Sequence, residues 1–151
     1  VLINGTADGC ALSEVFSMEK QQVNIREQSP LNLAFVGDSV FELLVRRHLV
    51  EYTRLQPGKL HSEAIKYVSA RAQFAALPLL EPLLTEEEAA VLHRGKNTSK
   101  ASVAKHASPE EYRASTGMEA LFGWLCLQGQ EERIQELFEV IWQQFDPNAH
   151  K

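Results

Sequence analysis

Helix-start signals recur along this chain and constrain its fold more than any other feature. A serine followed by proline, at Ser29-Pro30 and again at Ser108-Pro109, places a capping side chain before a residue whose fixed φ suits the first helical turn. Thr85 and Ser108 each stand three residues before a glutamate, which is the pattern of a capping box. No alternating apolar and polar run predicts a strand. The sequence therefore predicts an all-α fold.

The 151 residues, 44% of them apolar, suffice for one domain with a proper core. We expect that domain over residues 29–146, between an N-terminal segment, 1–28, and a tail, 147–151. Residues 1–17, which precede Met18, are expected to be a leader, a remnant foreign to the native protein or the remainder of a longer precursor. Caps and apolar spacing predict helices over residues 30–51, 59–77, 85–95, 109–127 and 131–145, and a break near Gly117 stays open. Around Pro78 and Pro82 we expect short turns or a kinked helix, and over 96–107 an exposed loop.

The charges are segregated, although the net charge is −5. Residues 43–106 hold ten basic residues against six acids, and no acid occurs between Glu88 and Glu110. This local excess fits a phosphate-bearing partner, and it fits an ordinary solvated loop equally well. The two cysteines match no zinc or disulfide spacing, and no apolar run is long enough to span a membrane. We therefore expect an intracellular protein without a membrane anchor.

One carboxylate lies in unusual surroundings. Asp38 interrupts the apolar run 33–41, where an unpaired buried charge is costly. Gly37, directly before it, adds about 1 kcal/mol relative to alanine in a helix interior. A metal site or a catalytic acid would explain both features. The alternative is a solvated aspartate on a half-buried helix.

A second acid repeats the pattern. Glu119 is the only charge between Arg113 and Glu131, in a helix rich in small residues. Ala120 and Gly123 would let another backbone approach closely. If that neighbour is the helix of Asp38, the two carboxylates repel each other unless a cation lies between them or one is protonated. Oxygen ligands without Cys or His favour Mg²⁺ or Mn²⁺ over zinc.

These two motifs resemble those of the ribonuclease III family. The run Leu33-Ala34-Phe35-Val36-Gly37-Asp38-Ser39-Val40 is similar to its signature Leu-Glu-Phe-Leu-Gly-Asp, and 115–123 is similar to its Asp-x-x-Glu-Ala helix. The chain departs from the family at Ala34 and Thr116, where the larger enzymes carry two further acids. These departures and the short sequence after the last expected helix resemble the Mini-ribonuclease III branch, whose members are stand-alone catalytic domains.

The resemblance implies an Mg²⁺-dependent endoribonuclease, with Mn²⁺ as a substitute ion. A homodimer would cut both strands of double-stranded RNA, leaving 5′-phosphate and 3′-hydroxyl ends and a short 3′ overhang. The implied substrate is the precursor of large-subunit ribosomal RNA, with a ribosomal protein as a candidate partner. The implied location is the bacterial cytoplasm, or the plastid stroma in a plant.

The same resemblance assigns roles to individual residues. Asp38 and Glu119 match family acids and are the candidate catalytic and metal-binding residues. Glu42 either orients a metal-bound water or is a solvent-facing acid, and Thr116 is a candidate to support the metal ligands without binding the ion. The candidate RNA-binding residues are Arg94, Lys96, Asn97 and Lys100.

Two other functions stay open because half of the expected acid cluster is missing. The first is a non-catalytic RNA-binding or ribosome-associated module with the same fold. The second is an all-α protein-interaction domain, which would leave the acid-free basic stretch and the two acids unexplained.

Overall fold

The computed structural model describes residues 24–98 and 106–145, and it is helical throughout these ranges apart from short connections. The predicted all-α fold is confirmed. None of the helices in the described ranges combines the length and apolar character that crossing a membrane requires. Residues 1–17, Lys100 and the tail 147–151 lie outside the described residues. The elements in chain order are η1 (Ile25–Glu27), α2 (Pro30–Tyr52), α3 (Pro57–Val68), α4 (Ala70–Leu80), η2 (Glu81–Leu83), α5 (Glu86–Thr98), α6 (Pro109–Leu127) and α7 (Glu131–Phe145).

The three predicted helix starts are capped as expected. The Ser29 hydroxyl accepts a hydrogen bond from the Asn32 amide at 3.1 Å. Ser108 forms the complete capping box, accepting from the Glu111 amide at 3.1 Å while its own amide donates to the Glu111 side chain at 3.0 Å. Thr85 forms only half of its predicted box, because its hydroxyl accepts from the Glu88 amide but the Glu88 carboxylate is engaged elsewhere.

Two predicted boundaries are wrong for physical reasons. The single helix expected over 59–77 is divided at Ser69, which has extended backbone angles and caps α4 by accepting from the Ala72 amide at 3.2 Å. α5 does not end at Gly95 but continues to Thr98, so residues 96–98 are helical and not part of a loop as expected. Gly95 is buried against α6, where an added Cβ would lie 2.8 Å from the Gly117 Cα. Close packing, and not chain reversal, therefore accounts for both glycines, and α6 runs unbroken through Gly117.

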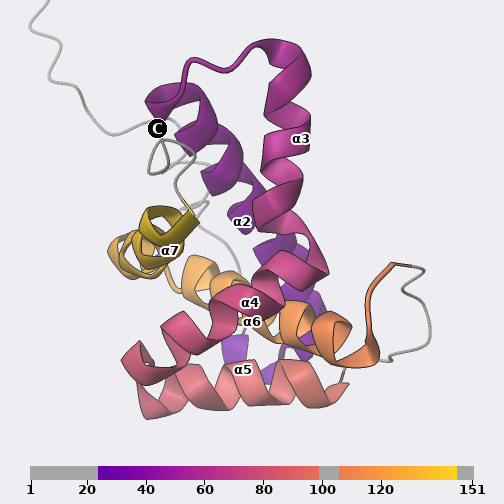
Figure 1. Cartoon of the computed structure of the whole chain (residues 1–151). Coiled ribbons are helices and arrows are strands. Elements are labelled where there is room, and N and C mark those ends of the chain that lie inside the picture. Colours follow the sequence, from indigo (N-terminus) through magenta and orange to yellow (C-terminus); the bar gives the residue numbers. More distant parts are fainter. Residues whose placement is uncertain (1–23, 99–105, 146–151) are drawn as a thin grey trace, which may run out of the picture.

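The central element is α6, which contacts α2, α4, α5 and α7 (Figure 1). Three fully buried aromatic rings join α2, α6 and α7 at the core. Phe41 meets Phe122 and Phe138 edge-on, with ring centroids 5.5 and 5.7 Å apart. This core fixes α2 across α6, which is the arrangement on which the candidate site depends.

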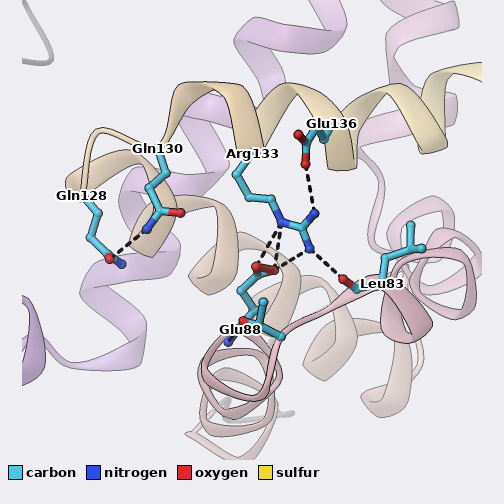
Figure 2. Close-up of polar contacts among 7 residues, drawn as sticks. Leu83, Glu88, Gln128, Gln130, Arg133 and Glu136 are labelled. Carbon is cyan, nitrogen blue, oxygen red and sulfur yellow. Dashed lines mark hydrogen bonds and ion pairs between the residues drawn. The ribbon is translucent and has the colours of Figure 1, made fainter.

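A buried ion pair fastens α7 to α5 (Figure 2). Glu88 is only 4% exposed, and its carboxylate accepts three hydrogen bonds from the Arg133 guanidinium at 3.0 to 3.2 Å. The same guanidinium donates to the Leu83 carbonyl at 2.6 Å and to Glu136 at 3.0 Å. A buried carboxylate needs such full pairing to be tolerated. Glu88 is therefore explained by the fold, and α5 is held at both ends, by this pair and by the contact of Gly95 with Gly117.

Candidate active site

The site is organised by a backbone crossing between α2 and α6. A Cβ added at Gly37 would lie 1.6 Å from the main-chain oxygen of Glu119, and one added at Gly123 would lie 1.8 Å from the main-chain oxygen of Leu33. No side chain larger than hydrogen fits at either position without moving a helix. Close packing therefore explains the glycine before Asp38. Because Gly37 touches the backbone of Glu119, Asp38 follows directly after a residue at the contact.

The two predicted carboxylates are brought together across this crossing. Burial, together with the negative charge of Asp38, raises the pKa of Glu119 to about 7. Partial burial also raises the pKa of Asp38, as does the charge of Glu42. Asp38 itself is exposed, so the expected buried aspartate is wrong, and the half-solvated alternative describes its surroundings better. The pair forms an acidic site open to solvent on one side.

The raised pKa of Glu119 predicts a pH dependence of stability in the absence of metal. Between the ordinary carboxyl value of 4.5 and about 7, the folded state holds this proton more tightly than the unfolded state does. The free energy of unfolding is therefore expected to fall as pH rises through this window. Thermal unfolding with EDTA at pH 5 to 8 measures the slope, and Glu119→Gln should flatten it. An identical pH profile in the variant would contradict the assignment.

Sequence reasoning missed one residue of this site. Gln73 on α4 is 1% exposed, and its amide nitrogen donates to Glu119 Oε1 at 3.5 Å. The hydrogen bond opposes the effect of burial on the Glu119 pKa. A correct assignment of the α4 start would have indicated Gln73. When α4 begins after Ser69, Gln73 lies on the same buried face as Ala76, Leu77 and Leu80. A glutamine on an apolar stripe is a candidate for a specific polar contact.

Comparison with known proteins shows which family carries the two motifs around Asp38 and Glu119. A model of the ribonuclease III domain matches residues 31–130, which is most of the described chain and includes both carboxylates. The chain belongs to the ribonuclease III family, in its Mini-ribonuclease III branch. Mini-ribonuclease 3 of Symbiobacterium thermophilum is 46% identical over 111 residues, covering 74% of this chain and 85% of the relative. Mini-ribonuclease 3 of Streptococcus pneumoniae is 47% identical over 112 residues, covering 73% and 86%.

A solved structure shares the fold. The crystal structure of a protein from Fusobacterium nucleatum superposes with a TM-score of 0.73 at 26% identity, covering 82% of this chain and 99% of that one. The family model and the Mini-ribonuclease 3 relatives confirm the resemblance inferred from the two motifs. This ribonuclease III family member is an endoribonuclease, which decides against the non-catalytic module and the protein-interaction domain.

The family departures are visible in the packing. Ala34 is 7% exposed and packs in a small apolar cluster with Leu33, Val91 and Ala120, so the position of the missing family glutamate is part of the core. Thr116, at the other missing acid, is buried and its hydroxyl donates to the Tyr112 carbonyl at 3.0 Å. Among the described residues, no group of three or more Asp, Glu, His or Cys side chains could hold a metal ion. Any ion at this site of the ribonuclease III domain would therefore depend on two carboxylates.

The remaining candidate acid, Glu42, lies one helical turn after Asp38 and is close enough to raise the pKa of Asp38. Its carboxylate is paired with Arg46, with Oε1 2.6 Å from Nη2, on an exposed part of α2. This pairing favours the solvent-facing interpretation, while a role in orienting a bound water stays a prediction. Thr116 as a support for the metal ligands likewise stays a prediction.

Three of the four predicted RNA-binding residues, Arg94, Lys96 and Asn97, lie on the last turns of α5. Arg94 and Asn97 are exposed, and the Asn97 amide lies 2.9 Å from His93 Nε2. Lys96 is half-buried, with its side chain at the α5–α6 contact: a Cβ at Gly117 would lie 2.6 Å from Lys96 Cγ. The end of α5 that carries these residues therefore packs on α6 at Gly117, which is two residues before Glu119 in the sequence. Lys100 lies outside the described residues.

Proposed function

We propose that this endoribonuclease cleaves double-stranded RNA with a divalent cation held by Asp38 and Glu119. The observation that carries the proposal is the juxtaposition of these two carboxylates across the Gly37–Gly123 crossing, where burial of Glu119 and the negative charge of Asp38 together raise the pKa of Glu119 to about 7. A buried carboxylate whose pKa is raised by a neighbouring acid forms, with that acid, a site whose charged state becomes favourable when a cation lies beside them. The comparisons support the reaction class, because the relatives are ribonucleases.

The donor set fits magnesium. Mg²⁺ keeps several waters and is often bound through one or two protein carboxylates, so the loss of acids at Ala34 and Thr116 is compatible with binding. Mn²⁺ accepts the same oxygen ligands. When bound, the ion supplies Lewis-acid polarisation of the scissile phosphate and a water of lowered pKa. The chain itself contributes Asp38 and Glu119 as ligands and keeps their carboxylates in register through the helix crossing.

The end of α5 supplies the proposed RNA surface. The cationic groups of Arg94, Lys96 and Lys100 would contact phosphates, and Asn97 would contact phosphate or 2′-hydroxyl oxygens. Recognition of this kind reads the shape and backbone of an RNA duplex and weakens steeply with salt. The family resemblance further supports the precursor of large-subunit ribosomal RNA as the substrate, with a ribosomal protein as a candidate partner.

The deciding experiment compares one duplex RNA under three conditions: with Mg²⁺, with Mn²⁺ and with EDTA. We expect cleavage with either metal, no cleavage with EDTA, and products with 5′-phosphate and 3′-hydroxyl ends. Single-stranded RNA of the same sequence is the control for substrate class. Cleavage that persists in EDTA would contradict the metal proposal, and preferential cleavage of the single strand would contradict the duplex proposal.

An apolar face on α2 supports the proposed homodimer. Phe35 is 83% exposed and lines a shallow groove with Val36, Ser39, Val40 and Leu43. Leu31 and Val50 are further exposed apolar residues of α2, at 47% and 65% exposed. An exposed apolar groove of this kind is typical of an interaction site. A second copy packed there would bring two Asp38 side chains toward one interface, because Asp38 lies beside this face.

Phe35→Glu is therefore expected to convert the dimer into monomers, since a charge would be buried at the centre of the interface. Sedimentation velocity over a range of protein concentrations measures the change. Ile65→Glu, which alters an exposed apolar residue on α3, is the matched control and should leave the dimer intact. A Phe35→Glu protein with the same mass in solution as the wild type would rule out this face.

A further inference from the structure

The side chain of Gln73 is buried in an environment that leaves one of its two polar atoms without a partner. It is 1% exposed, and within the described residues its Oε1 accepts no hydrogen bond. An unpaired buried amide oxygen costs on the order of 1–3 kcal/mol. An apolar residue on the stripe formed by Ala76, Leu77 and Leu80 would avoid that cost. The glutamine therefore needs an explanation beyond core packing.

The other polar atom of the side chain joins the site to the end of α3. Nε2 donates to the Val68 carbonyl at 3.3 Å and to Glu119 Oε1 at 3.5 Å. The Val68 carbonyl can only accept, and this fixes the orientation of the amide, with the nitrogen toward Glu119 and the oxygen away from it. The Val68 contact in turn anchors the side chain to the backbone where α3 ends. Gln73 is thus a donor held in place on both sides of its nitrogen.

The chemical type of this donor suits a cation site. A lysine or arginine in the same place would neutralise Glu119 permanently and compete with a metal ion. An amide donates a hydrogen bond without carrying a charge, so it can orient the carboxylate and leave its negative charge available. Donors that orient metal ligands in this way usually affect affinity or activity by about 10- to 100-fold.

We propose that Gln73 is a positioning residue that holds the Glu119 carboxylate beside Asp38 in the orientation that binds the divalent cation. The inference rests on the proposed function of the two acids as metal ligands. It assigns to α4 a part in the site, alongside the α2 and α6 motifs that carry the acids. Removing the amide should then weaken metal binding while leaving duplex RNA binding, which uses other residues, unchanged.

Gln73→Met tests this, because methionine keeps the length of the side chain and removes the amide oxygen and nitrogen. We expect the dissociation constant for Mn²⁺, measured by electron paramagnetic resonance on the full chain, to rise about 10-fold or more. The kcat at fixed Mg²⁺ should fall while KM for duplex RNA stays the same. Gln143→Met is the matched control, since Gln143 donates to the Glu139 carboxylate at 3.1 Å on the exposed surface of α7. It should change neither quantity.

A second measurement on the wild-type chain covers the case in which Gln73→Met fails to fold. Titration with Mg²⁺ should shift the side-chain amide resonances of Gln73 and leave those of Gln143 in place. A wild type that binds Mn²⁺ while Gln73→Met binds it equally well overturns the positioning role, as does a Gln73 amide unmoved at saturating Mg²⁺. A wild type that binds neither ion overturns the proposed metal site itself, so the two failures are distinguishable.

Discussion

Asp38→Asn and Glu119→Gln are each expected to lower kcat for cleavage of duplex RNA by roughly a thousandfold or more. Both substitutions keep the shape of the side chain and remove the charge that attracts a cation. Ala34 and Thr116 stand where the family resemblance leads us to expect two further acids, which leaves Asp38 and Glu119 as the proposed ligands. Among the described residues no group of three or more potential ligands could hold a metal ion, so each variant keeps a single proposed carboxylate ligand.

The loss should be confined to catalysis. Binding of duplex RNA in Ca²⁺ or EDTA, measured by fluorescence anisotropy, should stay within about twofold of the wild type, because Arg94 and Asn97 lie on α5 and not on the helices of the acids. Glu139→Gln, an exposed acid on α7, is the control and should keep full activity. Either site variant cleaving at more than a tenth of the wild-type rate would show that these acids do not hold the essential ion.

Glu119→Gln should also raise the melting temperature in EDTA above that of the wild type at pH 8. At that pH the wild type carries a charged Glu119 in a half-buried position near Asp38, while the amide is neutral. If Glu119 destabilises the fold in the absence of metal, its role at this position is to bind a ligand and not to stabilise the packing. The same comparison at pH 5, where Glu119 is protonated, should show a smaller difference.

Helix starts could be predicted from the sequence where a capping side chain determines them and no tertiary contact intervenes. Serine and threonine caps mark helix starts through hydrogen bonds to neighbours three residues away, and Ser29, Thr85 and Ser108 all form them. Ser69 forms the same cap, but the apolar spacing across it suggested a continuous helix and the break was missed. Gly95 looked like a helix end because glycine commonly follows the last turn, yet a tertiary contact with Gly117 explains it.

From the sequence, only those site residues could be predicted that carry a charge within an apolar run. Asp38 and Glu119 stand out because each is a lone acid in an apolar run. The small residues of α6 predicted a closely packed neighbour, but the sequence did not show that this neighbour is the helix of Asp38. Gln73 carries no charge and lies in a different helix, so nothing local connects it to Glu119. Its contact depends on how α4 packs against α6. The apolar face around Phe35 was likewise hidden, since apolar residues in a sequence do not reveal which of them remain exposed.

Gly37→Ala is expected to be the most destabilising conservative substitution in the described part of the chain. The new methyl group would lie 1.6 Å from the Glu119 carbonyl oxygen, 2.6 Å from its carbonyl carbon and 2.7 Å from the Gly123 amide nitrogen. All three are backbone atoms of α6, so no side-chain rotation relieves the overlap, and the two helices must separate. We expect a loss of more than about 3 kcal/mol in the free energy of unfolding, or roughly 10 °C in melting temperature.

Gly58→Ala is the matched control, because Gly58 is also helical and an added Cβ there meets nothing within 4 Å. Alanine suits a helix better than glycine by up to about 1 kcal/mol, so this variant should melt at the wild-type temperature or slightly above it. If Gly37→Ala melted like Gly58→Ala, α2 and α6 would have to lie farther apart than the structure places them. The spacing of Asp38 and Glu119 would then be wrong as well, since the crossing at Gly37 sets both.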